Sequence, residues 1–179
     1  MTWVMVDVEA DGPCPGLYSM TEIGLVVIDE KLEPKDMPSF YGQLRPLPGA
    51  DYVQEALDVC GRTWVETLQF DHPQQVMLKV RSFLHANCKG NPRFISDNNG
   101  FDWQFVNFYF WMFLNENPFG HTSTNLGSLY KGMEKDFFTS FKHLRKTEHT
   151  HHPVDDCLGN VEALLHMKRE MGLKMRFNK

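Results

Sequence analysis

The sequence predicts an α/β fold in which a central mixed β-sheet is flanked by α-helices. Strand-like segments come first along the chain, and strands then alternate with helices, an order typical of one mixed sheet covered by helices. At 179 residues, of which 42% are apolar, the chain is long enough to bury a large core. This length predicts a single domain over residues 1–179. It also argues against disorder and coiled coil.

Three strands are expected in the first quarter of the chain. Residues 3–8 alternate and are rich in valine, which predicts a strand. Pro13 and Gly16 then favour a turn. Residues 23–28 are almost continuously apolar, which is typical of a buried strand, and residues 40–44 are a plausible third strand.

Helices dominate the remainder. Residues 53–68 look helical with a break near Gly61, and Pro73 fits the first turn of a helix that runs to about residue 86. A short strand is expected over residues 93–96, followed by a helix that ends near residue 114.

The C-terminal third is expected to hold two helical regions. Residues 118–125 read as a loop or short strand, and residues 126–144 as a broken helix. A final helix should open at Pro153, with Asp155 as its N-cap, and run to about residue 171. Gly172 suits the end of that helix.

Charge and targeting signals exclude several classes of protein. The formal net charge is −5, so nucleic acid could be bound only through local basic patches or metal ions. The most apolar stretch, residues 101–114, is shorter than the roughly 20 residues that cross a bilayer, so we expect no membrane association. The cysteines are widely spaced and no secretory signal leads the chain, which predicts a cytoplasmic location.

Two acids on the first predicted strand are the first candidate for chemistry. Asp7 and Glu9 are two residues apart, so their side chains point to the same face and lie about 7 Å apart along the strand. Val6 and Val8 mark the opposite face as core. Such a pair is also compatible with a solvated strand end.

A third acid, Asp102, opens the predicted helix that follows residues 93–96. An acid in the first turn is favoured by the helix dipole, which would explain it without any function. Its neighbours are aromatic, however, including Phe101, Trp103 and Phe105. A carboxylate in such surroundings is costly unless a cation or hydrogen-bond donors compensate its charge.

The third candidate is the histidine-rich segment 149–157, which leads into the last helix. A capped helix preceded by a polar loop would account for it. A zinc site formed by His149, His151 and Cys157 is an alternative, although the paired spacing of structural zinc ligands is absent. A thiol nucleophile at Cys157 beside His151 is a further alternative.

Taken together and in this order, the three motifs resemble the DEDDh 3'–5' exonucleases. Asp7 and Glu9 match the first motif and Asp102 the second, while His151 and Asp156 match the H-x-x-x-x-D spacing of the third. The surrounding strings are most similar to a bacterial and phage branch of small exoribonucleases first recognised in mycobacteria. One departure is Pro153, where family members often carry a small residue.

The resemblance implies a ribonuclease H-like fold and a metal-dependent 3'–5' exonuclease that releases nucleoside 5'-monophosphates from nucleic-acid 3' ends. Asp7, Glu9, Asp102 and Asp156 would hold two Mg²⁺ or Mn²⁺ ions, which prefer oxygen ligands. His151 would be the general base. RNA is favoured over DNA only through the exoribonuclease branch. A DNA exonuclease, a non-catalytic module that binds nucleic-acid ends, and a zinc or thiol hydrolase are the alternatives.

Substrate contacts and a partner are predicted on weaker grounds. The loop after Glu9 would lie against the terminal nucleotide, Met20 could pack beside a base, and two aromatic side chains could stack on bases. These predicted contacts are Ala10, Asp11, Gly12, Met20, Phe101 and Trp103. The aromatic residues between 101 and 113 exceed what one buried helix face needs, so we expect a homodimer that uses part of this helix.

Overall fold

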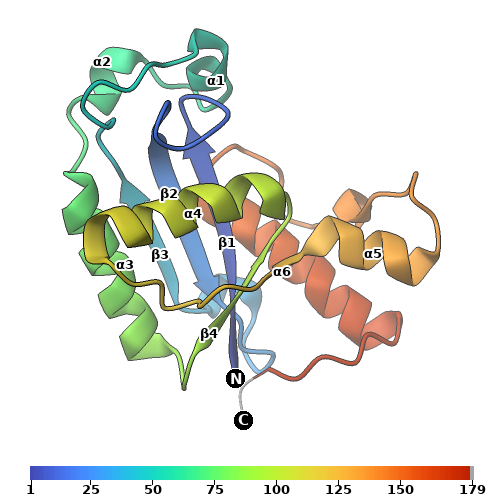
Figure 1. Ribbon diagram of the computed structural model, residues 1–179. Helices are drawn as coiled ribbons and strands as arrows, with labels where there is room; N and C mark the ends of the chain where they lie inside the picture. The colour runs from blue at the N-terminus through green and yellow to red at the C-terminus, as the bar shows by residue number, and fades with distance from the viewer. Residues whose placement is uncertain (178–179) are drawn as a thin grey trace.

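The computed structural model describes residues 1–177 as a five-stranded mixed sheet with helices on both faces (Figure 1). The strands are β1 (Thr2–Ala10), β2 (Met20–Val27), β3 (Ser39–Gln43), β4 (Pro92–Ser96) and β5 (Ser123–Asn125). The α-helices are α1 (Gln54–Val59), α2 (Trp64–Thr67), α3 (Pro73–Asn87), α4 (Asn99–Leu114), α5 (Leu126–Glu134) and α6 (Pro153–Glu170). Two short 3₁₀ helices are η1 (Pro34–Asp36) and η2 (Phe141–Leu144).

The sheet has the order β3-β2-β1-β4-β5, which places β1 at its centre. β1 pairs antiparallel with β2, and β2 pairs antiparallel with β3. β4 is parallel to β1 and to β5. The mixed α/β architecture predicted from the order of the elements is therefore confirmed.

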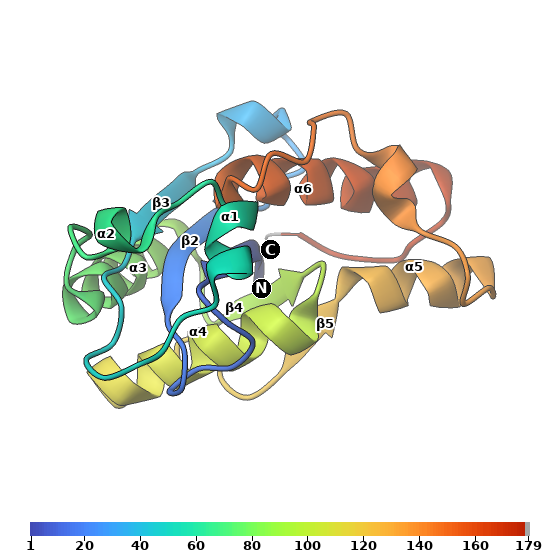
Figure 2. The ribbon, with the colours of Figure 1, turned by 90° about the horizontal axis from the view of Figure 1, so that it is seen from above.

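Each face of the sheet carries its own core. The even-numbered residues of β1 from Val4 to Ala10 pack with α3 and α4 on one face. Met5 faces the other core, which contains α5 and α6. Figure 2 shows α4 and α6 on opposite sides of the sheet. Because side chains alternate along a strand, Asp7 and Glu9 lie on the α6 side of β1.

Most predicted elements are present with shifted ends. β2 begins at Met20 and not at residue 23, so it contains Glu22, a buried charged residue that the apolar run left out. Asp155 is not the N-cap of α6. Pro153 occupies the first helical turn, so the cap falls on His152, and Asp155 lies within that turn.

A glycine in β2 lets the start of α6 lie directly on the sheet. Gly24 pairs with Asp7 across the β1–β2 ladder. A Cβ at position 24 would lie 2.5 Å from the backbone carbonyl carbon of Pro153 and 2.7 Å from its Cβ. The structure thus accommodates the proline that departs from the family pattern, and this packing sets the first turn of α6 beside Asp7.

We expect Gly24→Ala to lower the free energy of unfolding by about 1–3 kcal/mol, since the added methyl forces the first turn of α6 away from the sheet. Denaturant unfolding measures this loss. Gly132→Ala is the matched control, because position 132 lies in α5 with open space around its Cβ. Equal stability of the two variants would contradict close packing at Gly24.

No helix in the described residues is long and apolar enough to cross a membrane.

Candidate active site

Two of the candidate acids come from the carboxyl-terminal half of β1. Asp7 and Glu9 project from the face opposite Val6 and Val8, as the alternation predicts, and both are half-buried. The edge where β1 and its parallel neighbour β4 end is therefore lined by carboxylates. β4 leads into α4, whose first turn carries the third acid.

Asp102 reaches β1 from the first turn of α4. Its side chain is buried, and its Oδ1 accepts a hydrogen bond from the backbone N–H of Val8, 3.2 Å away. Since Val8 lies between Asp7 and Glu9, this bond fixes the Asp102 carboxylate beside both of them. Among residues 1–177, no hydrogen-bond partner lies within reach of the buried Asp102 Oδ2.

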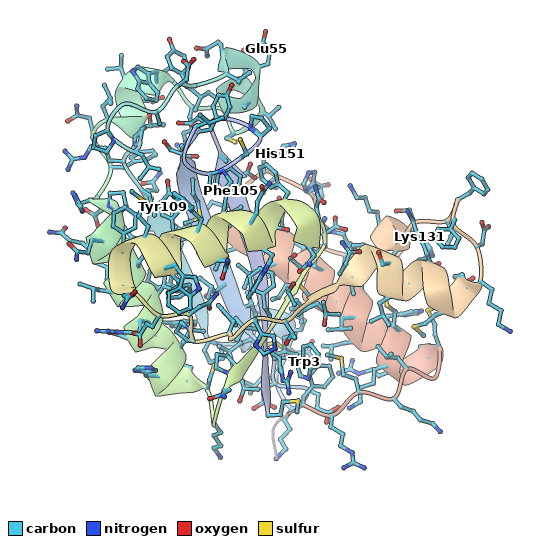
Figure 3. All side chains as sticks on the ribbon, viewed as in Figure 1. Trp3, Glu55, Phe105, Tyr109, Lys131 and His151 are labelled. Carbon is cyan, nitrogen blue, oxygen red and sulfur yellow. The ribbon has the colours of Figure 1, made fainter. Side chains whose placement is uncertain are left out.

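The fourth acid and the candidate base come from the start of α6. Asp156 is buried, and its Oδ1 lies 2.6 Å from a guanidinium nitrogen of Arg145 and 2.6 Å from Nδ1 of His149. His151 precedes the helix with a left-handed backbone, φ 58°, a conformation that is uncommon for residues other than glycine, although histidine adopts it more often than most. Figure 3 labels His151 near the carboxyl end of β1.

Sequence reasoning did not anticipate the partners of Asp156. Arg145 has a side chain that is only 5% exposed, and a Cβ at position 159 would lie 2.3 Å from its Nε. Gly159 on α6 therefore makes room for this guanidinium. No local pattern around Arg145 marks it as buried, whereas His149 could be seen in the histidine-rich segment.

The carboxylates converge closely enough to perturb one another. One oxygen each of Asp7, Glu9 and Asp156 lie within 4.8 Å of one another. Burial, and then the charges of Asp102 and Glu9, raise the pKa of Asp7 well above its usual range. Burial is also the main cause that raises the pKa of Glu9 to about 7 and that of Asp102 to about 7.

These side chains fit divalent cations. The donor set consists of carboxylate oxygens, the ligands that Mg²⁺ and Mn²⁺ prefer. Buried oxygens of Asp102 and Asp156 lack hydrogen-bond partners within the described residues, and cations would neutralise the clustered charge that raises the carboxyl pKa values.

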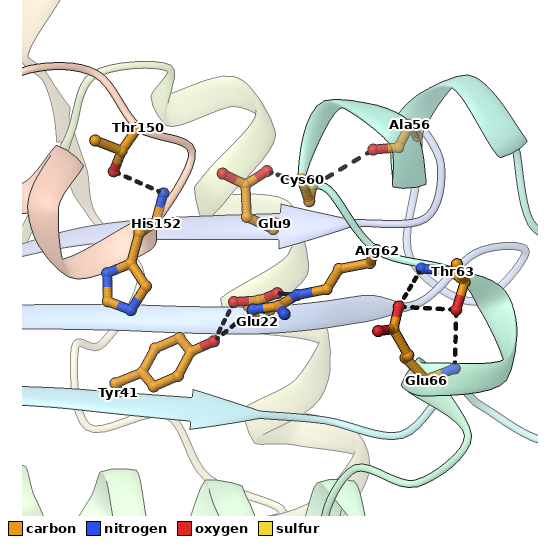
Figure 4. Close-up of polar contacts among 10 residues, drawn as sticks. All are labelled: Glu9, Glu22, Tyr41, Ala56, Cys60, Arg62, Thr63, Glu66, Thr150 and His152. Atoms are coloured by element: carbon orange, nitrogen blue, oxygen red, sulfur yellow. Dashed lines mark hydrogen bonds and ion pairs between the residues drawn. The ribbon is translucent and has the colours of Figure 1, made fainter.

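A further buried acid, outside the predicted set, lies beside the site on β2 (Figure 4). Glu22 pairs with Glu9 across the ladder and is neutralised by Arg62, whose Nε donates to it at 2.6 Å. The Tyr41 hydroxyl also donates to Glu22. Glu9 itself accepts a hydrogen bond from the Cys60 thiol at 3.0 Å. Glu22 is thus an ion pair next to the cluster, and its charge contributes to the raised pKa of Glu9.

The loop after β1 is held firmly. Asp11 is fully buried and accepts a hydrogen bond from the Ser19 backbone N–H, and a Cβ on Gly12 would overlap the ring of Tyr18. Ala10 and Met20 belong to the core. The structure therefore favours packing over base contact for the Met20 side chain, while contact through the loop backbone stays a prediction.

The aromatic candidates at the start of α4 are half-buried. Phe101 packs on Phe105, with ring centroids 5.1 Å apart, and Trp103 lies edge-on to Phe94 at 5.0 Å. Both rings therefore have core partners and some remaining exposed surface. Their stacking on bases stays a prediction.

Comparison with known proteins agrees with this geometry. No family model matches the chain. It is, however, 32% identical over 166 residues to the 3'-5' DNA exonuclease Cap18 of Escherichia coli, an alignment that covers 90% of this chain and 83% of the relative. The chain belongs to the DEDDh 3'–5' exonuclease family. That Asp7, Glu9, Asp102, His151 and Asp156 fill the catalytic positions of the family stays a prediction.

Solved structures confirm the fold of this DEDDh exonuclease. The nuclease domain of 3'hExo, a DEDDh family member bound to rAMP, superposes with a TM-score of 0.78 at 18% identity, covering 99% of this chain and 96% of that one. A complex of E. coli ExoI with single-stranded DNA, in its zinc-bound form, gives 0.73 at 16% identity, covering 94% and 41%.

The raised carboxyl pKa values predict how the metal-free DEDDh exonuclease responds to pH. A carboxyl with a higher pKa when folded binds its proton more tightly in the folded state, so its contribution to stability is lost as pH rises. For Glu9 and Asp102 the window runs from about 4, the unfolded value, to about 7.

In EDTA, we therefore expect the free energy of unfolding to fall by more than about 1.4 kcal/mol between pH 5 and pH 8, the equivalent of one pKa unit on one group. Denaturant unfolding at the two pH values measures the fall. Saturating Mg²⁺ should remove most of it. A metal-free protein that is more stable at pH 8 than at pH 5 would contradict the burial of like charges.

Proposed function

We propose that this protein is a metal-dependent 3'–5' exonuclease that releases nucleoside 5'-monophosphates from the 3' end of a nucleic acid. The observation that carries the proposal is the convergence of buried and half-buried carboxylates from three separate elements. Asp7 and Glu9 come from β1, Asp102 from α4 and Asp156 from α6. Together they would hold two ions, with Mg²⁺ or Mn²⁺ proposed from the oxygen-only donor set.

The proposed roles follow from the chemistry of phosphodiester hydrolysis. Divalent cations stabilise the negative charge that develops on the attacking and leaving oxygens. The four carboxylates would hold the cations. His151 takes the proton of the attacking water, because a neutral imidazole carries a ring nitrogen that can accept it. The water oxygen bonds to phosphorus as the bond between phosphorus and the 3' oxygen breaks. Solvent protonates the departing 3' oxygen, and the next nucleotide becomes the new 3' end.

DNA is the first candidate substrate. The support for it is the 32% identity to a protein named as a DNA exonuclease, over nearly the whole of both chains. The fold neighbour in complex with single-stranded DNA is consistent with this choice. DNA thereby takes precedence over the RNA preference that the motif strings predict.

RNA is the second candidate. It is supported by the motif strings that resemble the exoribonuclease branch and by a fold neighbour bound to rAMP. A second neighbour, a 3'-exonuclease that recognises the 3' end of a histone mRNA stem-loop, has a TM-score of 0.73 at 17% identity. Discrimination between the two would require contacts to the 2'-hydroxyl.

Digestion of matched single-stranded DNA and RNA oligonucleotides tests the proposal. Each carries a 5' label and is incubated with Mg²⁺, Mn²⁺ or EDTA, with the parent protein and His151→Ala. We expect single-nucleotide shortening from the 3' end that stops in EDTA, and faster digestion of DNA. Faster digestion of RNA would identify RNA, and not DNA, as the preferred substrate. Binding without shortening in either metal would identify a non-catalytic end-binding module.

Two features bear on the thiol alternative and on oligomeric state. Cys157 is fully buried, with its thiol directed at the carbonyl of Gly24, which disfavours it as a nucleophile.

Trp111 and Met112 on α4 are more than half exposed. We propose that they contribute to a homodimer, which light scattering of the parent and of Trp111→Ser would test. Cytoplasmic location stays a prediction.

A further inference from the structure

We propose that His149, His151 and Asp156 form a second metal site, selective for zinc and similar transition-metal ions, and that its occupation inhibits the exonuclease. The inhibitory part rests on the proposed function, whereas the binding part does not. The site uses one residue outside the DEDDh motif, His149, and two residues inside it.

The three side chains already lie at ligand distance. One donor atom from each lies within 4.8 Å of the others. The two imidazole rings meet edge to face with centroids 4.2 Å apart, and His149 Nδ1 is 2.6 Å from Asp156 Oδ1. An ion would take the place of that hydrogen bond, with a small outward movement of the exposed His149 ring.

The donor chemistry separates this site from the carboxylate cluster. Two imidazole nitrogens and one carboxylate oxygen are a donor set that Zn²⁺ binds with three protein ligands and an open position. Mg²⁺ demands oxygen ligands and has little affinity for imidazole. The same few residues thus offer one all-oxygen group and one nitrogen-rich group, which different metals should prefer.

Asp156 belongs to both groups. A carboxylate oxygen of Asp156 lies within 4.8 Å of an oxygen of Asp7 and of Glu9. A carboxylate oxygen of Asp156 also lies within 4.8 Å of a ring nitrogen of each histidine. An ion held by His149 and His151 would therefore compete for a carboxylate of the hydrolytic site. It would also occupy the imidazole proposed to accept the proton from water. Both effects predict inhibition.

The structure favours Asp156 over the cysteine that the sequence offers as a third zinc ligand. Cys157 is fully buried on the side of α6 that faces the sheet, and its Sγ lies 3.5 Å from the carbonyl oxygen of Gly24. One helical residue earlier, Asp156 faces the histidines. The third ligand of the proposed site is therefore the carboxylate of Asp156 and not the thiolate of Cys157.

Zinc titration of the Mg²⁺-supported nuclease tests the inhibitory part, with every rate expressed relative to the same variant without zinc. We expect the parent to be inhibited, and His149→Ala to need at least about tenfold more zinc for the same inhibition, since it loses a ligand. His85→Ala is the matched control, because His85 is an exposed histidine on α3 and should behave like the parent.

Calorimetric titration with Zn²⁺ alone tests the binding part without activity. It is carried out in Asp7→Asn, which weakens the carboxylate cluster, with and without His149→Ala. Loss of zinc affinity in the double variant supports the site even if the protein has no nuclease activity. His149→Gln replaces His149→Ala if the alanine variant does not fold. Unchanged affinity, or equal inhibition of the parent and His149→Ala, would show that zinc binds the carboxylates and would overturn the proposal.

Discussion

Asp7→Asn is expected to reduce exonuclease activity at least about 10³-fold while raising the stability of the metal-free protein. The loss of activity follows because Asp7 is central to the carboxylate group. Metal ions contribute several kcal/mol to the transition state of such reactions. Each 1.36 kcal/mol corresponds to a factor of ten in rate. Loss of this stabilisation should therefore slow hydrolysis by about 10³-fold.

The gain in stability follows from the close approach of the carboxylates to one another. The Asp7 carboxyl is destabilised by burial and by the charges of Asp102, Glu9 and Asp156. An amide of similar shape removes one of these charges without leaving a void. We expect the free energy of unfolding in EDTA to rise by about 1–3 kcal/mol at pH 8, because repulsion between partly buried carboxylates is of this order.

Denaturant unfolding in EDTA and an oligonucleotide assay in Mg²⁺ measure the two effects in one variant. Asp155→Asn is the matched control: it neutralises an acid in the same helical turn as Asp156, but Asp155 is about half exposed and lies outside the carboxylate group. We expect the control to keep its activity. An Asp7→Asn protein that is less stable than the parent without metal would refute the repulsion.

His151→Ala is expected to lower the turnover rate by about 10²–10⁴-fold, the usual contribution of a general base. Binding of the metal should persist, since the carboxylates remain. His149→Ala provides the comparison, because its ring lies next to that of His151. If His149→Ala loses more activity than His151→Ala, the base is His149 and the motif assignment is wrong.

His151→Gly separates catalysis from backbone strain at the same position. The φ of 58° at His151 costs a non-glycine residue about 1–2 kcal/mol. We therefore expect the glycine variant to be about 1 kcal/mol more stable than the alanine variant, and equally inactive. Thermal unfolding of the two variants measures the difference. Equal stability would mean that the loop relaxes when the imidazole is removed.

Local pattern was enough to predict much of the fold. The alternation in β1 correctly set the two acids on the face opposite the valines. Pro73 and Pro153 begin helices, as their fixed φ predicts. The pattern failed where a charge is buried, since the continuous apolar run placed the start of β2 after Glu22. Nothing local reveals that Arg62 neutralises this glutamate and that the Tyr41 hydroxyl donates a hydrogen bond to it.

The sequence by itself determined the order of the elements, the acids on β1, and the spacing of His151 and Asp156, because these depend on neighbours within a few residues. Only the tertiary structure decided which groups surround them. Arg145 meets Asp156 through the space left by Gly159, and α6 reaches Asp7 through the space left by Gly24. Both contacts depend on the absence of a side chain on another segment, so no local pattern can encode them.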